Sequence, residues 1–298
     1  MLFSLPIIVI IVFVEYYLRT QTMFTKKRDY AEKNLENIEV LFLGSSQVGE
    51  SIYPEYTNKA SINLAGPGQT IPIDYYLLKK YINEMPKLKV LVFEIAPHRL
   101  YNDFKMNTRI AYMYSNLYGI RHKVDPYSYK NHSFLFSDFQ FYSSIFYKLI
   151  ISKKQIISNY GKTNTVVDGR FFDLKYDTTE IDKSFVMVHK LNDEKQFQKS
   201  VKYIDEVVEI CRNKRIKLIF ISPPFYKTYY SKIPEKAKKE TNLLLNRYLI
   251  ENNIRNFDLS DGSKLKFLNV YDYADDHHLN FKGGKKFTLF VDSVLNLK

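Results

Sequence analysis

The chain has no tryptophan and a single cysteine among its 298 residues. One cysteine excludes a disulfide within the chain, so cysteine usage indicates no redox compartment. No internal repeat and no low-complexity tract is present. Helix-turn-helix, zinc-finger and RNA-binding signatures are missing too, so we expect no nucleic-acid partner. What is there is the composition of a globular protein, with 45% hydrophobic and 26% charged residues.

Positive charge and aromatic side chains are both abundant. The formal net charge is +12, and 25 tyrosines and 22 phenylalanines are present. A positive balance suggests an anionic neighbour, such as lipid headgroups or an acidic polymer, although scattered lysines and arginines also make an ordinary solvated surface. The aromatic content favours a packed core or a carbohydrate-binding surface.

The N-terminus is apolar almost without interruption from Leu2 to Val14. With Tyr16 to Leu18 the stretch reaches about 17 residues, near the short limit for crossing a bilayer. No A-x-A-like cleavage site follows it. We therefore expect a single-pass membrane anchor over residues 1–24, with a buried hydrophobic helix as the alternative.

The charges around this segment conflict with the simplest topology. No lysine or arginine precedes the segment, whereas it is followed by Arg19, Lys26, Lys27 and Arg28. The positive-inside rule would then leave the body of the protein in the cytoplasm. We expect instead a missing or very short cytoplasmic start and an extracytoplasmic domain over residues 25–298.

Apolar runs alternate with helical patterns along most of that domain. Five runs are typical of buried strands: Ile38–Leu43, Ser61–Leu64, Leu88–Ile95, Arg215–Ser222 and Ile254–Leu259. Helices are expected after Thr70, over Lys195–Arg212 and Glu235–Asn252, and after Asn280. This alternation predicts an α/β fold, a mostly parallel sheet of about five strands covered on both faces.

Residues 100–190 break this rhythm. The segment is rich in tyrosine, phenylalanine, asparagine and serine and has no clean periodicity. A long irregular insertion in a compact fold is usually a lid or a surface for substrate or partner. We therefore expect an aromatic-rich insertion that covers the site.

Two short stretches at opposite ends of the domain carry the candidate chemistry. Gly44-Ser45-Ser46 follows the first strand, and Asp275 stands three residues before His278. Serine is a weak nucleophile until a base takes its proton, and the base needs a third group to orient it. A plain turn with capping serines is the alternative for the first stretch.

Gly44-Ser45-Ser46 resembles the first block of the SGNH/GDSL hydrolase superfamily, and Asp275-Asp276-His277-His278-Leu279-Asn280 resembles its Asp-x-x-His block. The resemblance implies a flavodoxin-like three-layer α/β/α fold. It also implies a catalytic triad of Ser46 as nucleophile, His278 as base and Asp275 as the orienting carboxylate. Asp276 with His277 is the competing pair, and Asp275, His277 and His278 as metal ligands are a rival interpretation.

The resemblance also implies an oxyanion hole. Asn63-Leu64-Ala65-Gly66-Pro67-Gly68-Gln69-Thr70 is similar to the family's second block, so the N–H groups of Ser46 and Gly68 would hold the oxyanion, with Gly66 as the alternative to Gly68. The family's Gly-x-Asn-Asp block is absent. His98 stands near the place of its asparagine, and we expect it to complete the oxyanion hole as a hydrogen-bond donor. We also expect Arg99 and Gln69 to contact substrate.

With the N-terminal anchor, these blocks look like membrane-anchored bacterial proteins of cell-envelope assembly, similar to alginate O-acetyltransferases and the teichoic-acid D-alanyl-transfer protein. The resemblance implies transfer of an acyl group through Ser46 to an envelope polysaccharide. The partners would be an acyl donor, a glycan acceptor and a multi-spanning membrane acyltransferase, with no cofactor and no metal. A carbohydrate esterase with the same triad, or a non-catalytic glycan-binding or scaffold protein on a degenerate fold, are the alternatives.

Overall fold

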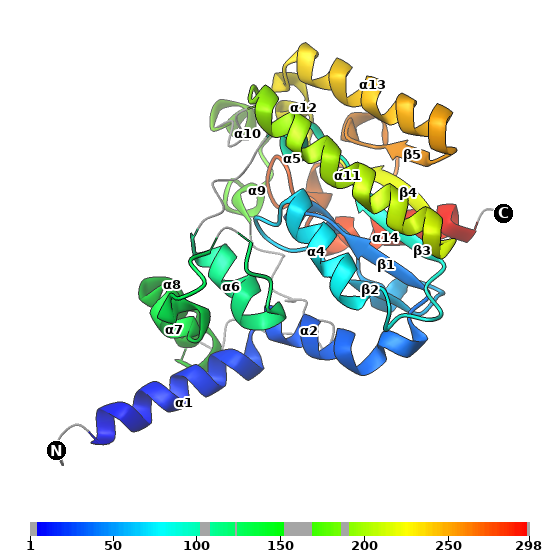
Figure 1. Ribbon diagram of the computed structural model, residues 1–298. Coiled ribbons are helices and arrows are strands. Elements are labelled where there is room, and N and C mark those ends of the chain that lie inside the picture. The colour runs from blue at the N-terminus through cyan, green and yellow to red at the C-terminus, as the bar shows by residue number, and fades with distance from the viewer. Residues whose placement is uncertain (1–4, 102–107, 123, 152–168, 186–190, 297–298) are drawn as a thin grey trace. The chain divides into compact units, whose positions relative to one another are not determined.

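The computed structural model describes residues 5–101, 108–122, 124–151, 169–185 and 191–296. The chain divides into two compact units. One comprises residues 1–33 and 105–165, and the other comprises residues 34–104 and 166–298. Figure 1 shows the elements of both units, coloured along the chain.

The larger unit is built on a sheet of five parallel strands in the order β2-β1-β3-β4-β5. The strands are β1 (Val40–Leu43), β2 (Ser61–Asn63), β3 (Val90–Glu94), β4 (Lys217–Ser222) and β5 (Arg255–Asp258). All five predicted strands are present, each a little shorter than its apolar run. This strand order is that of flavodoxin-like sheets, so the α/β fold class expected from the sequence is confirmed.

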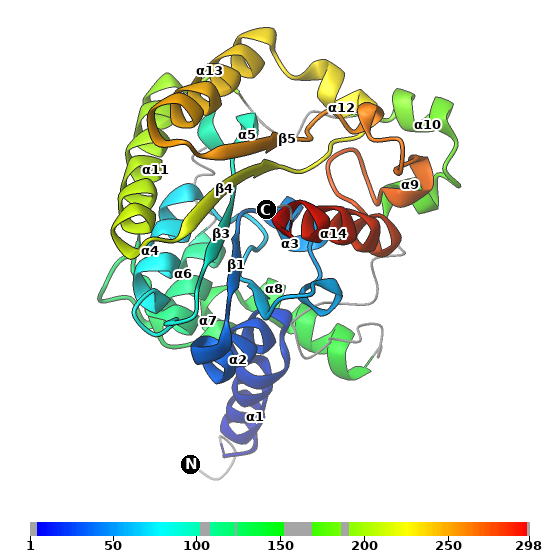
Figure 2. The same cartoon turned by 90° about the vertical axis from the view of Figure 1, so that its right-hand side faces the viewer.

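Helices cover both faces of this sheet (Figure 2). On one side lie α4 (Ile71–Tyr81) and α11 (Glu194–Lys214), which pack against each other; on the other lie α3 (Ser46–Ser51) and α14 (Phe281–Asn296). The faces follow from the strand period of two, because successive side chains point to opposite sides. The layer beside α14 therefore gathers alternate strand residues with those of α3 and α14: Val40, Phe42, Val90, Val92, Val48, Ile52, Phe287 and Val291.

The remaining helices of this unit connect and flank the sheet. They are α5 (Pro97–Tyr101), α9 (Arg170–Asp173), α10 (Thr178–Lys183), α12 (Lys227–Lys232) and α13 (Glu235–Asn252). The helix after Asn280 begins at Phe281, and the Asn280 side chain accepts from the Gly283 N–H at 3.0 Å as a cap. Thr70 is the N-cap residue of α4, but its side chain makes no capping hydrogen bond. Cys211 is buried, as its place on the apolar stripe predicts.

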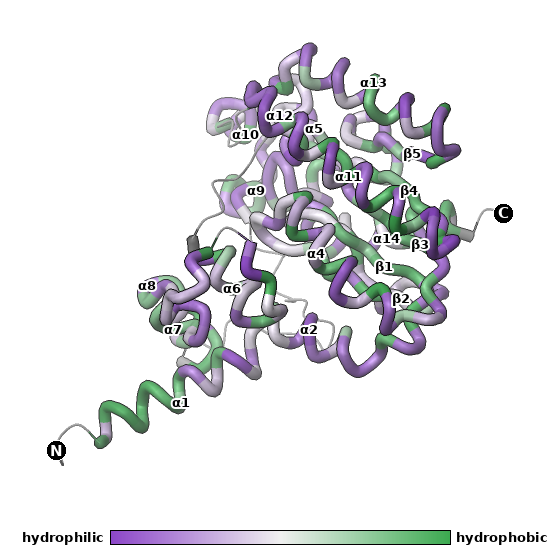
Figure 3. The backbone as a smooth tube through the Cα atoms, in the orientation of Figure 1, coloured by the Kyte–Doolittle hydropathy of each residue, from purple (hydrophilic) through white to green (hydrophobic). Residues whose placement is uncertain are grey.

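The smaller unit is helical over its described residues. It contains α1 (Leu5–Gln21), α2 (Met23–Asn34, whose last residue falls in the larger unit), α6 (Thr108–Tyr118), α7 (Phe134–Ser137) and α8 (Phe139–Phe146), which continues as a π-helical turn over Tyr147–Ile151. The first part of α1 is apolar around its whole circumference (Figure 3). Apart from Ile11, its apolar side chains from Leu5 to Phe13 are about half exposed or more, from 53% at Phe13 to 61% at Ile10 and Val12.

Charges in the second half of α1 have partners within the smaller unit. Glu15 accepts from the backbone N–H groups of Phe134 and Leu135, at 2.9 and 3.0 Å, at the start of α7. Arg19 pairs with Glu15 at 2.8 Å and donates to the His132 carbonyl at 2.7 Å. These polar groups fasten α1 to the segment that follows α6.

No single helix within the described residues has the length and apolar composition to cross a membrane. The pair Leu5–Gln21 and Met23–Asn37 meets the criterion jointly, with a bend of 55° between its halves. The expected anchor over residues 1–24 and the expected insertion over residues 100–190 stay predictions.

Candidate active site

The candidate nucleophile stands at the first turn of α3, directly after β1. Ser45 is the N-cap residue, and its Oγ accepts from the Gln47 N–H at 3.2 Å. Ser46 is the only residue of the segment 41–49 that is not buried. The turn at the carboxyl end of β1 thus brings one hydroxyl toward solvent and keeps its neighbour inside, where open parallel sheets bind their ligands.

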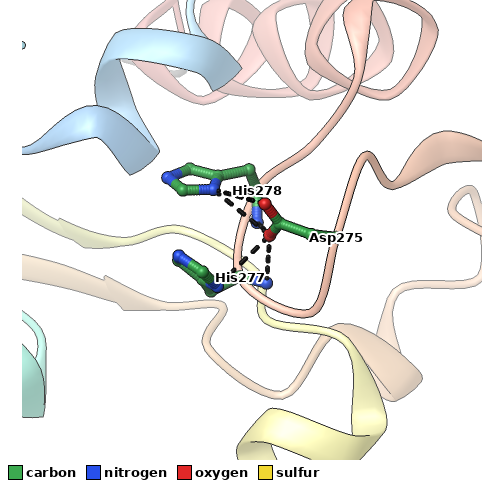
Figure 4. Close-up of side chains that lie close together, drawn as sticks. All are labelled: Asp275, His277 and His278. Atoms are coloured by element: carbon green, nitrogen blue, oxygen red, sulfur yellow. Dashed lines mark hydrogen bonds and ion pairs between the residues drawn. The ribbon is translucent and has the colours of Figure 1, made fainter. Parts of the chain in front are cut away.

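The Asp275 and His278 side chains lie in the loop before α14, and His278 reaches Ser46. Its Nε2 is 2.7 Å from the Ser46 Oγ, and its Nδ1 is 3.0 Å from Oδ2 of Asp275. Figure 4 shows the Asp275 carboxylate between the ring of His278 and the backbone of its own loop. With the proton on Nδ1, His278 donates to Asp275 and its Nε2 accepts from the serine hydroxyl.

The loop fixes the Asp275 carboxylate before any substrate arrives. Its Oδ1 accepts from the backbone N–H groups of His277 and His278, each at 2.9 Å. Burial opposes ionisation, but the charge of His278 and its hydrogen bond hold the pKa of Asp275 well below its ordinary value. Burial likewise disfavours an imidazolium, yet the Asp275 carboxylate raises the pKa of His278 above its ordinary value. The pair is therefore built to stabilise a positive charge on His278.

In the competing pair, Asp276 has other partners, whereas His277 also contacts Asp275, with its Nδ1 3.2 Å from the Asp275 Oδ1. The Asp276 carboxylate forms an ion pair with Arg170 of α9 and accepts from the Thr228 hydroxyl. The ring of His277 lies beside that of His278, with 4.1 Å between their centroids, and 5.6 Å from that of Tyr229. The hydrogen-bonded chain that ends at Ser46 thus runs through Asp275 and His278.

The Arg170 contact also involves part of the predicted insertion. The Phe171 N–H donates to the Ala274 carbonyl at 3.0 Å, and the Phe171 side chain is fully buried against Tyr226. Helix α9 therefore supports the loop that carries Asp275. The prediction that the whole insertion covers the site stays a prediction.

The two backbone N–H groups expected to form the oxyanion hole, one after β1 and one between β2 and α4, have no partner among the described residues. Ser46 is the first residue of α3, where an N–H has no acceptor within the helix. Gly68 has φ +64°, a backbone conformation that favours glycine, and its N–H makes no hydrogen bond to the described part of the chain. The Gly66 N–H donates to the Gly44 carbonyl at 3.2 Å. Of the two glycines, Gly68 therefore has the N–H that is available for an oxyanion.

His98, Arg99 and Gln69 lie on the buried side of the turn. The His98 Nε2 is 3.4 Å from Glu94 and 3.5 Å from the Ser45 Oγ, and the side chain is 2% exposed. Arg99 pairs with Asp74 at 2.5 Å, and the Gln69 amide donates to the same carboxylate. The oxyanion role of His98 and the substrate contacts of Arg99 and Gln69 stay predictions, because these contacts favour a structural role for all three.

Sequence reasoning missed two buried carboxylates at this place. Glu94 is the last residue of β3 and is fully buried, and Asp74 lies in the first turn of α4 and is fully buried too. An acidic residue directly after the apolar run Val90–Phe93 was the signal for Glu94, since carboxylates are almost never fully buried without a partner. Asp74 gave no such signal, because Asp in a first helical turn is ordinary.

The loop also offers a group of potential metal ligands. One ligand atom each of Asp275, His277 and His278 lie within 4.8 Å of one another. In the hydrogen-bonded arrangement, however, both ring nitrogens of His278 already have partners, Asp275 and Ser46. Binding a metal through Nδ1 would replace the hydrogen bond to Asp275.

Comparison with known proteins gives distant structural matches only. No protein-family model matches the sequence, and no curated protein matches it. A putative acylhydrolase from Bacteroides fragilis matches with a TM-score of 0.42 and 15% identity over 89% of this chain and 94% of its own. A GDSL-like lipase from Bacteroides thetaiotaomicron matches with a TM-score of 0.44 and 12% identity, over 93% and 100%. A lipase/acylhydrolase from Enterococcus faecalis matches with a TM-score of 0.40 and 11% identity, over 87% of this chain and 95% of its own. Since these TM-scores lie below 0.5, we infer neither ancestry nor activity from the matches.

Proposed function

We propose that this protein forms an acyl-ester on Ser46 and passes the acyl group to a hydroxyl acceptor. The observation that carries the proposal is the hydrogen-bonded chain from the Ser46 Oγ through His278 to Asp275. A nucleophile within hydrogen-bond reach of a base, which a third group orients, is the arrangement that nucleophilic catalysis requires.

The first half of the reaction loads the serine. The Ser46 Oγ attacks the acyl carbonyl while its proton moves to Nε2 of His278, and the Asp275 carboxylate stabilises the resulting imidazolium. The carbonyl oxygen becomes an oxyanion, which the N–H groups of Ser46 and Gly68 stabilise. As the bond to the donor breaks, the leaving alcohol takes the proton from His278.

The second half returns the enzyme to its starting state. An acceptor hydroxyl attacks the acyl-ester and gives its proton to Nε2 of His278. The proton then moves to the Ser46 Oγ as the serine leaves. Water as the acceptor makes the protein an esterase, and a sugar hydroxyl makes it an acyltransferase.

We propose that the protein is an acyltransferase, with an envelope polysaccharide as acceptor and α1 as a membrane anchor of an extracytoplasmic domain. Two properties support this choice. The net charge of +12 suits an anionic glycan or lipid surface. Apart from Ile11, the apolar side chains of α1 are exposed from Leu5 to Phe13, which costs free energy in water and is favourable in lipid. An SGNH-type carbohydrate esterase is the second candidate, because the same three side chains serve it.

The proposal is tested by labelling Ser46. The full chain, purified in detergent, is treated with a fluorophosphonate and separately with an activated acetyl ester, and the modified residue is located by mass spectrometry. We expect label on Ser46, absent from Ser46→Ala and reduced by about 10³-fold or more in His278→Ala. Folded protein that reacts with neither reagent would contradict the proposal and favour a non-catalytic glycan-binding protein.

A second measurement separates transfer from hydrolysis. The acetylated protein is incubated with and without an oligosaccharide that has free hydroxyls, and the products are separated. Acetyl sugar formed at the expense of free acetate supports the transferase. Free acetate released at the same rate in both incubations supports the esterase.

A further inference from the structure

The nucleophile turn lies on two buried carboxylates to which no role in the reaction has been given. Glu94, at the end of β3, accepts from the Ser45 N–H at 2.5 Å with one carboxylate oxygen and from the Ser45 hydroxyl at 3.0 Å with the other. Both side chains are buried, and a polar group left unpaired in such a place destabilises the fold. Glu94 therefore fixes the residue that immediately precedes Ser46.

Asp74 lies close to the preceding residue, because the Gly44 backbone lowers the pKa of its carboxyl group, against the larger effect of burial. Arg99 connects the two carboxylates, since it pairs with Asp74 at 2.5 Å, lies 3.9 Å from the Glu94 carboxylate and donates to the Glu94 carbonyl at 3.0 Å. The Ser45 N–H thus donates to one of two buried acids that share the Arg99 guanidinium.

The packing at this point leaves no room for a side chain at Gly44. A Cβ atom at Gly44 would lie 2.5 Å from a carboxylate oxygen of Glu94 and 2.9 Å from the Cβ atoms of Glu94 and Val48. Burial raises the pKa values of Asp74 and Glu94, and the Arg99 charge opposes that rise. Burying this cluster therefore costs free energy, and removing any one of its three ionisable groups would leave the others without their partner.

We propose that Glu94, supported by Arg99 and Asp74, is a positioning residue for the nucleophile: it fixes Ser45 so that the Ser46 Oγ meets Nε2 of His278. The inference rests on the proposed function, because Ser46 is the reacting group. A displacement of about 1 Å in a reacting atom costs on the order of 10²-fold in rate, so a buried clamp one residue away has a direct kinetic effect.

The test compares Glu94→Ala with Glu94→Gln in the full chain. The glutamine keeps an oxygen that accepts from the Ser45 N–H and an amide that donates to the Ser45 Oγ, whereas the alanine removes both contacts. For fluorophosphonate labelling of Ser46, we expect the maximal rate to fall on the order of 10²-fold in Glu94→Ala with little change in the half-saturating probe concentration. Glu94→Gln should restore the rate to within about tenfold of the parent.

Asp292→Ala is the matched control. Asp292 of α14 is also buried and accepts from the Asn58 backbone and side chain, at 3.0 and 2.5 Å. Asn58 precedes β2 and so lies toward the opposite end of the sheet from Ser46. We expect Asp292→Ala to lower the melting temperature and to leave the labelling rate unchanged. Glu94→Asp, which is one methylene too short to reach both Ser45 atoms, replaces Glu94→Ala if that variant does not fold.

Hydrogen exchange at the Ser45 amide gives a readout that needs no activity. We expect faster exchange in Glu94→Ala than in Glu94→Gln or Asp292→Ala. Labelling and exchange in Glu94→Ala equal to those in Asp292→Ala would overturn the inference. If the parent protein itself takes no label, the proposed function fails, and exchange at Ser45 alone decides whether Glu94 holds the turn.

Discussion

The Nε2 atom of His278 lies 2.7 Å from the Oγ atom of Ser46, although 232 positions separate the two residues in the chain. The contact joins the first turn after β1 to the loop before α14. These segments meet because α3 and α14 cover the same face of the sheet. The reactive pair therefore depends on the fold as a whole.

Reactivity and stability should respond to pH in opposite directions around the pKa of His278. Asp275 raises that pKa despite burial, with smaller contributions from the Glu50 and Glu94 charges. His278 acts as a base only when neutral, so the labelling rate of Ser46 should rise with pH through an inflection above the ordinary value of about 6.5. A group whose pKa is higher in the folded than in the unfolded state stabilises the fold at pH values below its unfolded-state pKa. This contribution is lost as the pH rises through its folded-state pKa. Chemical denaturation across this pH window should show that stability falls as labelling rises. His278→Ala should remove this pH dependence of the stability.

Asp275→Asn should separate orientation from acid–base strength. The asparagine keeps a carbonyl oxygen for the two loop N–H groups but removes the charge that raises the His278 pKa. We expect labelling to fall on the order of 10⁴-fold and its pH inflection to move to lower pH.

Asp276→Asn serves as the control for this loss of charge. Its carboxylate pairs with Arg170 and Thr228, so the change should lower the melting temperature and leave the pH inflection in place. A pH inflection that moves in Asp276→Asn and not in Asp275→Asn would show that Asp276, and not Asp275, orients His278.

His277→Gln distinguishes a serine triad from a metal site. In the hydrogen-bonded arrangement His277 is a neighbour of the base, whereas in a metal site it is one of three ligands. We expect His277→Gln, and separately an excess of a chelator, to leave Ser46 labelling within about tenfold of the parent rate. Loss of labelling with the chelator and its recovery on adding zinc would favour the metal site.

Gly44→Ala should destabilise the protein and slow its labelling together. The added methyl group meets the Glu94 and Val48 side chains, both buried, so the turn has to shift. We expect a loss of about 1–3 kcal/mol in the free energy of unfolding, measured by denaturant titration. A variant as stable as the parent would show that the turn can move, and would weaken the case for a fixed clamp.

The sequence by itself determined the five strands and the principal helices, because their signals are local. The apolar run Ile38–Leu43 and the stripe on Lys195–Arg212 depend only on the spacing of neighbouring residues. The positions of Ser46, Asp275 and His278 followed from short blocks in the same way. The unit that joins residues 1–33 with 105–165 left no such signal, because it depends on contacts such as those of Glu15 with α7.

Tertiary structure alone decided among the alternatives that the sequence left open. Asp275 rather than Asp276 meets His278, because Arg170 from a distant segment holds Asp276. Gly68 rather than Gly66 has an N–H without a partner in the described part of the chain, because the Gly66 N–H donates to the Gly44 carbonyl. Arg99 next to the turn suggested a substrate contact, but its partner Asp74 comes from another helix. Hydrogen bonds and ion pairs between remote segments have no period in the sequence, so only the folded chain shows which of two adjacent groups is already in use.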